Sequence, residues 1–172
     1  MKNIVLIGFM GSGKSSMGRF LSRELDYDFF DTDKELENVT GLKVHQIMKK
    51  YGKIRFASEE RLIVKKLAAM DHTIIATGGT FIDNEENIKA LKGNSVFVFL
   101  DVDDEIIIDR LKRRRVRPFN EKGSLNELVP KIYGQRRPIY EQYADITVNT
   151  TEKTMEETAE EIFNRLDSIY VQ

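Results

Sequence analysis

The chain has 172 residues, a length that predicts a single domain able to bury a core without covalent crosslinks. It contains no cysteine, which excludes a disulfide scaffold together with thiolate metal and redox chemistry. Lysine and arginine total 27 against 28 aspartate and glutamate residues, and the resulting net charge of −1 gives no indication of a nucleic-acid-binding protein.

Short apolar runs alternate with longer amphipathic segments along the chain. The predicted order is strand 4–7, helix 14–25, strand 28–31, helices within 33–70 that are interrupted near Gly41 and Gly52, strand 73–76, helix 84–91, strand 95–100, helix 103–115, a polar stretch 116–123, helix 124–143, strand 145–148 and helix 154–169. We expect Pro130 to break or kink the helix over 124–143. The alternation of continuous apolar strands with helices predicts a three-layer α/β/α fold around a five-stranded parallel sheet, with ligands beyond the carboxyl ends of its strands.

A glycine-rich segment follows the first predicted strand and opens the first helix. Its sequence from Gly8 to Ser15, GFMGSGKS, fits the phosphate-loop pattern G-x-x-x-x-G-K-[ST] in full. The glycines allow backbone N–H groups to point at phosphate oxygens, Lys14 is suited to reach the β and γ phosphates, and the Ser15 hydroxyl group is suited to hold Mg²⁺. The pattern predicts a bound nucleoside triphosphate and leaves open a small-molecule kinase, an ATPase or a GTPase.

Two aspartates, Asp31 and Asp33, follow the second predicted strand and share a side if the chain stays extended there. Beside a phosphate loop, one can hold the Mg²⁺ shell while the other orients or deprotonates an acceptor hydroxyl group. The alternative is that Asp33 only caps the helix that follows it. We favour a functional role for at least one of the two.

Glycines and basic residues in the later part of the chain bear on the same site. Gly78 and Gly79 end the third strand and allow a small ligand to approach the backbone closely. The run KRRRVR at 112–117 has three interpretations: a basic mobile lid that closes on the nucleotide, a solvated helix face, or a nucleic-acid site. We favour the lid, because a kinase must exclude water from its nucleotide. Of the pair Arg136 and Arg137, one arginine is suited to bind an anionic acceptor bidentately.

Together these motifs resemble those of the shikimate kinases, phosphate-loop enzymes of the nucleoside-monophosphate-kinase-like fold. The resemblance covers nearly the whole chain, and it rests on IGFMGSGKS at 7–15, FDTD at 30–33, Gly52 with Phe56 and Glu60, ATGG at 76–79, Arg117 with Pro118, and Arg136 with Pro138 and Tyr140. It implies a single kinase domain over 1–172, with an acceptor-binding subdomain at about 33–61 and a lid at about 112–124. The implied reaction transfers a phosphoryl group from ATP to the 3-hydroxyl group of shikimate, a step toward aromatic amino acids.

The resemblance also implies roles for individual residues. Ser15 and Asp31 would hold Mg²⁺, and Asp33 would bind the shikimate hydroxyl groups and act as base or orienting group. The implied catalytic residues are Lys14, Asp33 and Arg117, the last stabilising the transferring phosphoryl group from the lid. The implied nucleotide-binding residues are Gly11, Ser12, Gly13, Lys14, Ser15, Ser16, Arg117 and Arg110, which would lie against the adenine. The implied acceptor-binding residues are Asp33, Gly78, Gly79 and Arg136, which would pair with the shikimate carboxylate.

Three positions depart from the family pattern, all on the acceptor side. Where the family reads G-E-x-x-F-R-x-x-E, this chain has GKIRFASEE at 52–60, so Lys53 replaces a glutamate and Ala57 replaces an acceptor-binding arginine. Thr80 replaces a third glycine. Losing one partner of a buried charge pair costs about 2–5 kcal/mol, so these changes suggest a weakened shikimate site or a changed acceptor. Arg55 lies about 200° around a helix from position 57 and should point to the other side.

Four functions follow from these observations, in order of preference. The first is a shikimate kinase with a compensated acceptor site, which Asp33 and Arg136 favour. The second is a kinase of another small polyol or hydroxy acid, which Ala57 and Thr80 favour. The third is an ATP-binding module without catalysis, and the fourth is a nucleic-acid role for the basic run. We expect ATP, Mg²⁺ and a small-molecule acceptor, and no nucleic-acid partner. A membrane partner is not expected, because no apolar run has the length of a membrane span. We further expect a cytoplasmic monomer.

Overall fold

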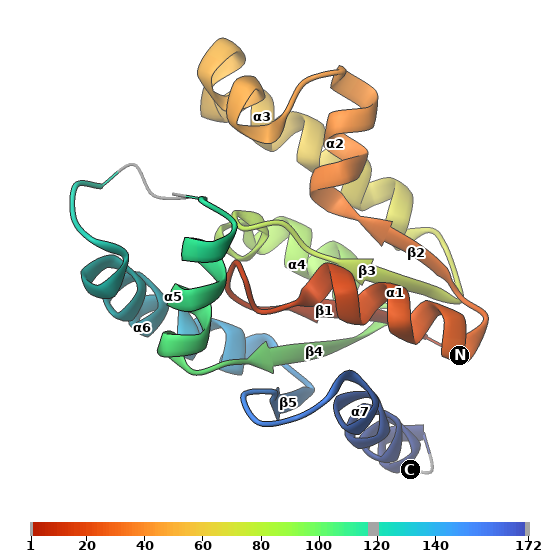
Figure 1. Cartoon of the computed structure of the whole chain (residues 1–172). Coiled ribbons are helices and arrows are strands. Elements are labelled where there is room, and N and C mark those ends of the chain that lie inside the picture. The colour runs from red at the N-terminus through yellow and green to blue at the C-terminus, as the bar shows by residue number, and fades with distance from the viewer. Residues whose placement is uncertain (1, 117–120, 171–172) are drawn as a thin grey trace.

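A computed structural model describes residues 2–116 and 121–170 of the chain. It is built around a sheet whose strands are β1 (Asn3–Ile7), β2 (Asp28–Asp31), β3 (Thr73–Ala76), β4 (Ser95–Asp101) and β5 (Ile146–Asn149). All neighbouring strands are parallel, in the order β2-β3-β1-β4-β5 (Figure 1). The predicted α/β fold with a five-stranded parallel sheet is therefore confirmed.

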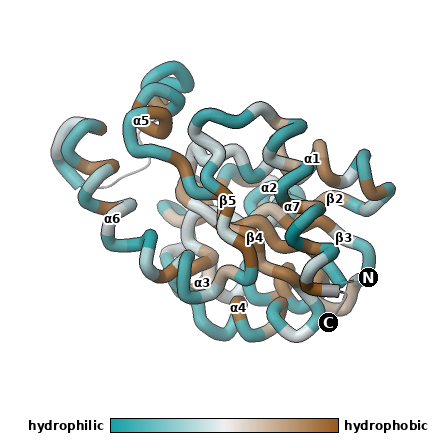
Figure 2. The backbone as a smooth tube through the Cα atoms, turned by 90° about the horizontal axis from the view of Figure 1, so that it is seen from below, coloured by the Kyte–Doolittle hydropathy of each residue, from teal (hydrophilic) through white to brown (hydrophobic). Residues whose placement is uncertain are grey.

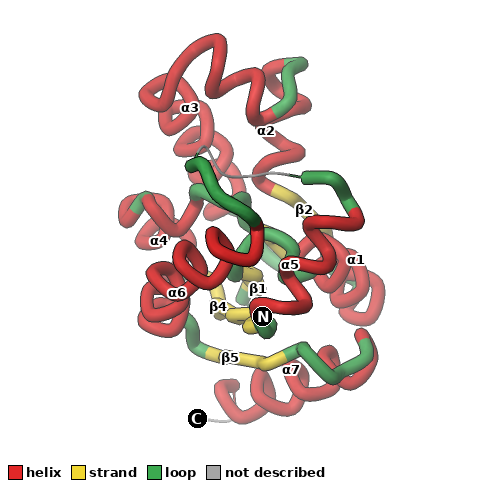
Figure 3. Tube along the Cα trace, turned by 60° about the vertical axis from the view of Figure 1, so that its left-hand side comes forward, coloured by secondary structure: helices red, strands yellow, loops and turns green. Residues whose placement is uncertain are grey.

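Helices connect these strands. In chain order they are α1 (Lys14–Leu25), α2 (Thr32–Thr40), α3 (Val44–Ala68), the short 3₁₀ helix η1 (Phe81–Asp83), α4 (Glu85–Lys92), α5 (Asp104–Arg113), α6 (Leu125–Tyr143) and α7 (Met155–Tyr170). Figure 3 shows them arranged around the strands, with α1 and α7 on one side and α4 and α6 on the other. In the described part of the chain, no helix combines the length and the apolar character needed to cross a membrane.

The sheet is buried on both faces because side chains along each strand alternate between two apolar cores. In β1, Val5 and Ile7 belong to the core shared with α3, α4, α5 and α6. Ile4 and Leu6 belong to the core shared with α1 and α7. All four side chains are buried. Figure 2 accordingly shows apolar residues concentrated along the strands and hydrophilic residues along much of the surrounding helices.

The segment 33–70, predicted as interrupted helices, forms most of α2 and α3. Helix α2 ends at Thr40 and is capped by Gly41. Gly41 has a φ of 69° and donates its backbone N–H to the carbonyl oxygen of Glu37 (2.9 Å). Within α3, Gly52 has φ 77° and ψ 176° and divides the helix into two segments. Both predicted interruptions are confirmed. In Figure 1, α2 and the first part of α3 stand above the sheet.

Helices α5 and α6 differ from their sequence predictions. Helix α5 ends at Arg113, and Arg115 has a left-handed φ of 52°, so the helix is shorter than the predicted 103–115. Helix α6 runs unbroken through Pro130 and Pro138, so the predicted break at Pro130 is wrong. Burial of one face offsets the backbone hydrogen bonds lost at the prolines. The buried side chains of that face are Leu128, Val129, Tyr133 and Tyr140.

The segments that follow the strands meet at one edge of the sheet, because all strands point their carboxyl ends the same way. The glycine-rich loop follows β1, Asp33 follows β2 and Gly78 follows β3. After β1 the chain forms β2 and β3 on one side of β1, and then β4 and β5 on its other side. Parallel sheets bind ligands at such a reversal of strand order.

Candidate active site

The loop between β1 and α1, residues 8–13, is rich in glycine and leads into the N-terminus of α1. Gly11 and Gly13 have φ values of 80° and 92°, which favour glycine. Ser12 is buried in this loop, and its hydroxyl group has no hydrogen-bond partner among the described residues. A buried, unpaired hydroxyl group beside the N-terminus of α1 fits a bound anion such as a phosphate group.

Lys14 begins α1 and points back into the loop. Its Nζ donates hydrogen bonds to the carbonyl oxygens of Gly8 (2.8 Å) and Phe9 (2.9 Å). Burial lowers the pKa of Lys14 to about 8, against the opposing effect of the nearby charges of Asp33 and Asp31. The loop therefore contains a largely desolvated positive charge, which attracts phosphate oxygens more strongly than an exposed lysine would.

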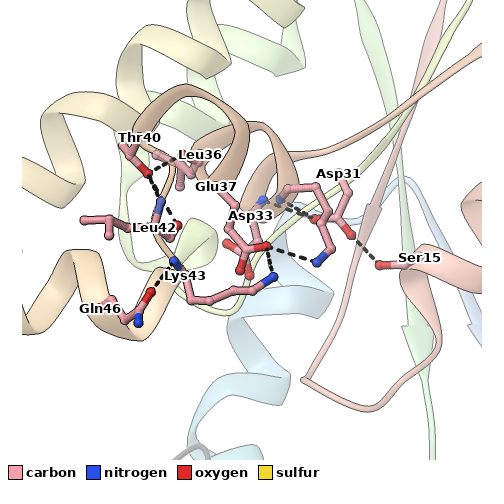
Figure 4. Close-up of polar contacts among 10 residues, drawn as sticks. Ser15, Asp31, Asp33, Leu36, Glu37, Thr40, Leu42, Lys43 and Gln46 are labelled. Atoms are coloured by element: carbon pink, nitrogen blue, oxygen red, sulfur yellow. Dashed lines mark hydrogen bonds and ion pairs between the residues drawn. The ribbon is translucent and has the colours of Figure 1, made fainter.

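Asp31, the last residue of β2, connects α1 with α2. Its Oδ2 accepts a hydrogen bond from Ser15 Oγ (2.5 Å), and its Oδ1 accepts from the backbone N–H groups of Asp33 (3.1 Å) and Lys34 (3.3 Å) (Figure 4). The residue that caps α2 is therefore Asp31 and not Asp33. Asp33 lies in the first turn of α2 rather than on an extended strand. The oxygens of Ser15 and Asp31 are the kind of ligand that Mg²⁺ prefers.

Asp33 lines a hollow of about 170 Å³ together with Lys14, Asp31 and Gly78. Burial raises the pKa of Asp33 to about 6, and the charge of Asp31 adds to the shift. Gly78 permits the close approach of this carboxyl group, since a Cβ at position 78 would lie 2.0 Å from Asp33 Oδ1. Thr32 Oγ1 fixes the same turn by accepting the backbone N–H of Gly78 (2.8 Å). A carboxyl group with a near-neutral pKa beside a phosphate loop is suited to deprotonate a hydroxyl group.

A second hollow, of about 190 Å³, adjoins the other side of the loop. Arg110 of α5 lines it and donates a hydrogen bond from Nη1 to the carbonyl oxygen of Gly11 (2.8 Å). Ser16 of α1 lines it as well. The opposite wall includes Lys153 and Thr154, just before α7. Sequence reasoning missed this wall, because its residues belong to no motif and reach the loop only through the fold.

A larger cavity, of about 770 Å³, lies between α3, the segment 80–86 and α6. Arg136 of α6 lines it. Its Nη1 donates a hydrogen bond to the carbonyl oxygen of Gly79 (2.6 Å), and its Nη2 forms an ion pair with Asp83 (3.0 Å). The guanidinium group is thereby held at the cavity wall, where its planar fork suits a carboxylate ligand.

Glu60 is a buried carboxyl group of the same cavity wall. Its Oε2 accepts a hydrogen bond from Asn87 Nδ2 (3.0 Å). Burial raises the pKa of Glu60 to about 7, and the charge of Asp33 contributes to the shift. Thr80 Oγ1 lies 3.5 Å from Glu60 Oε1. The φ of −99° at Thr80 is ordinary for any residue, so the backbone does not require the third glycine that the resemblance led us to expect.

The other departures from the family pattern lie on the wall formed by α3. Lys53 and Ala57 both line the large cavity. Arg55 instead lines a separate hollow with Thr40 and forms an ion pair with Glu59 (2.7 Å). Arg55 therefore faces away from the cavity, as its helical spacing predicts, and does not replace the arginine absent at position 57.

Residues 117–120 of the expected lid, which include Arg117, lie outside the described residues. Just before them, Arg114 lines the hollow of Asp33 and Lys14. Sequence reasoning treated Arg114 only as one charge in the basic run. No sequence signal distinguishes Arg114 from its basic neighbours, because only the fold brings it to this hollow.

Comparisons with known proteins identify the family of this chain. Residues 10–167 match the family model of shikimate kinase. The shikimate kinase of Pelotomaculum thermopropionicum is 43% identical over 166 residues, which cover 96% of each chain, and that of Thermodesulfovibrio yellowstonii is 37% identical over 169 residues, which cover 98% of this chain and 97% of the relative. The solved structure of shikimate kinase from Acinetobacter baumannii in complex with shikimate has a TM-score of 0.91 at 28% identity, covering 100% of this chain and 96% of that chain. The shikimate kinase from Aquifex aeolicus has a TM-score of 0.83 at 35% identity, covering 98% of each chain.

Proposed function

Because the chain belongs to the shikimate kinase family, we propose that it transfers the terminal phosphoryl group of ATP to the 3-hydroxyl group of shikimate. Membership makes the protein a phosphotransferase with an alcohol group as acceptor and associates it with the shikimate pathway. One observation carries the proposal: the phosphate loop with Lys14, the carboxyl group of Asp33 and the cavity with Arg136 meet at one edge of the sheet.

The nucleotide is assigned to the phosphate loop and the hollow beside Arg110. The backbone of Gly11 and Gly13, the unpaired hydroxyl group of Ser12 and the buried charge of Lys14 fit its phosphate groups. Ser16 and Arg110 extend this site toward the base and ribose. Ser15 and Asp31 would hold Mg²⁺, which supplies charge neutralisation at the phosphate oxygens.

Asp33 is assigned as the group that accepts the proton of the attacking hydroxyl group. Its pKa of about 6 leaves it ionised at neutral pH, yet basic enough to take up a proton. Lys14 and Arg114 line the same hollow and offset the negative charge there. Gly79 adjoins the hollow, and Arg136 binds the acceptor carboxylate. The resemblance adds Arg117 at the phosphoryl group. Transfer then needs positioning and charge neutralisation rather than a covalent enzyme intermediate.

The test is identification of the product. The protein is incubated with Mg·ATP and either shikimate or one member of a panel of small polyols and hydroxy acids, and the products are identified by ³¹P NMR and mass spectrometry. We expect a shikimate monophosphate and ADP in equal amounts, with none formed by Lys14→Ala. Transfer to another acceptor but not to shikimate would refute the assignment.

A kinase of a different small hydroxy acid is the second candidate. Two observations favour it: Ala57 offers no charge at the cavity wall, and Thr80 places a side chain next to Glu60. Both alter the volume and polarity of the acceptor cavity while the phosphate loop is unaffected. The same panel tests this candidate, because it predicts a kcat/KM for another acceptor that exceeds the value for shikimate.

A further inference from the structure

The acceptor cavity contains a second guanidinium group that no motif identified. Arg61 of α3 lines this cavity together with Arg136 of α6. Arg136 is already paired with Asp83 (3.0 Å), and the carboxyl groups of Glu60 and Glu85 belong to the same wall. Because Asp83 offsets the charge of Arg136, that arginine alone gives an anionic acceptor little net attraction. A further positive charge facing the cavity would strengthen the binding of a carboxylate here.

Arg61 is placed to supply that charge. Lys53, Ala57 and Arg61 are spaced four residues apart on the second segment of α3, and all three line the cavity. Side chains on a helix lean toward its N-terminus, so Arg61 leans toward Ala57, whereas Lys53 leans away from it. Ala57 itself places only a methyl group at the cavity wall.

The present partner of Arg61 is easily exchanged. Arg61 forms an ion pair with Glu86 of α4, and the two side chains are 48% and 67% exposed. Ion pairs with this exposure contribute little to stability, so a ligand carboxylate can take the place of Glu86 at small cost. Arg55, the other arginine of this segment, pairs with Glu59 in a different hollow and offers a matched control.

We propose that Arg61 binds the carboxylate of the acceptor together with Arg136 and so selects an anionic acceptor. The inference rests on the proposed function and adds a residue to its site. Ala57 cannot provide a guanidinium group at its position. Arg61 provides one instead, from one helical turn further along α3. The planar fork of an arginine suits this role better than the ammonium group of Lys53.

Steady-state kinetics with Mg·ATP and shikimate test the role of Arg61. We expect Arg61→Gln to raise the KM for shikimate about tenfold, with kcat and the KM for ATP changed less than about twofold, because the contact is made equally in the ground and transition states. Arg55→Gln removes an exposed arginine from the same helix and should leave all three constants unchanged.

The neutral methyl ester of shikimate shows whether Arg61 acts on the carboxylate charge. We expect Arg61→Gln to lower kcat/KM for shikimate about tenfold while leaving that for the ester nearly unchanged. An equal loss with both acceptors, or no loss with shikimate, would overturn the inference and leave the proposed function standing. A wild-type protein that does not phosphorylate shikimate would overturn both.

Discussion

Asp33 and Glu60 are carboxyl groups held where ionisation is unfavourable. Burial raises the pKa of Asp33 to about 6 and that of Glu60 to about 7. The folded protein therefore binds their protons more tightly than the unfolded chain does, and its stability falls as pH rises from about 4 through these values. The role proposed for Asp33 needs the ionised form, so the site gives up stability for reactivity.

Replacing Asp33 with asparagine separates stability from activity. Asp33→Asn should abolish phosphoryl transfer and raise the free energy of unfolding at pH 8 by about 1–3 kcal/mol, because the amide is never ionised. Thermal melts at several pH values test this: the melting temperature of the variant should exceed that of the wild type at pH 8, and the difference should shrink toward pH 4. A difference that is independent of pH would contradict the raised pKa.

Gly78 is required for the position of the Asp33 carboxyl group. A Cβ at this residue would lie 2.0 Å from Asp33 Oδ1, so Gly78→Ala must displace the carboxyl group or the turn. We expect kcat/KM for the acceptor to fall at least about tenfold, since a small misplacement of a catalytic group is costly. Gly134→Ala is the control, because a Cβ there meets no atom within 4 Å. Equal kinetics of the two variants would disprove the steric role of Gly78.

At the scale of elements, the break within α3 shapes the acceptor cavity. Gly52 has φ 77° and ψ 176°, a conformation that is almost restricted to glycine. The second segment of α3 begins after this residue and presents Lys53 and Ala57 to the cavity. The orientation of the cavity wall therefore depends on a single backbone conformation.

Gly52→Ala should strain this break. The expected loss is about 1–3 kcal/mol of unfolding free energy, the usual cost of a residue held in a sparsely populated conformation. Urea denaturation of the wild type and the variant measures it. Gly93→Ala is a matched control, because Gly93 has φ −61° and open space around its Cβ position. A loss of equal size in both variants would contradict the role of the backbone conformation.

The elements were largely predictable because their signals are local. Continuous apolar runs predicted the strands, and Gly41 and Gly52 predicted the interruptions between helical segments. The failures came from tertiary effects. Packing of one buried face carries α6 through Pro130. The positions of Arg61 and Arg114 depend on how distant elements meet, which no local pattern records.

At the scale of the whole molecule, the hollow beside Arg110, which we propose holds the nucleotide, brings together segments from the early and the late part of the chain. Ser12 and Ser16 come from the first strand-helix unit, Arg110 from α5, and Lys153 and Thr154 from the segment before α7. A ligand in this hollow would contact segments that lie far apart in the sequence. The monomeric state and the cytoplasmic location expected from the sequence stay predictions.

Nucleotide binding should therefore stabilise the entire fold. At an Mg·ATP concentration of 100 times Kd, linkage adds about 2.7 kcal/mol, which corresponds to a rise in melting temperature of roughly 5–11 °C. Differential scanning fluorimetry measures the rise. Lys14→Ala should lose most of it, because the buried ammonium group is the main cation of the phosphate loop. An undiminished shift in this variant would place the nucleotide elsewhere.

The two halves of the site are expected to act together on ATP and shikimate. The most direct test is the initial rate of ADP release with Mg·ATP over a range of shikimate concentrations. We expect a rate that rises with shikimate and saturates, that is negligible without it, and that is lost in Lys14→Ala. ADP release that does not depend on shikimate, in a protein that still binds ATP, would show that shikimate is not the acceptor.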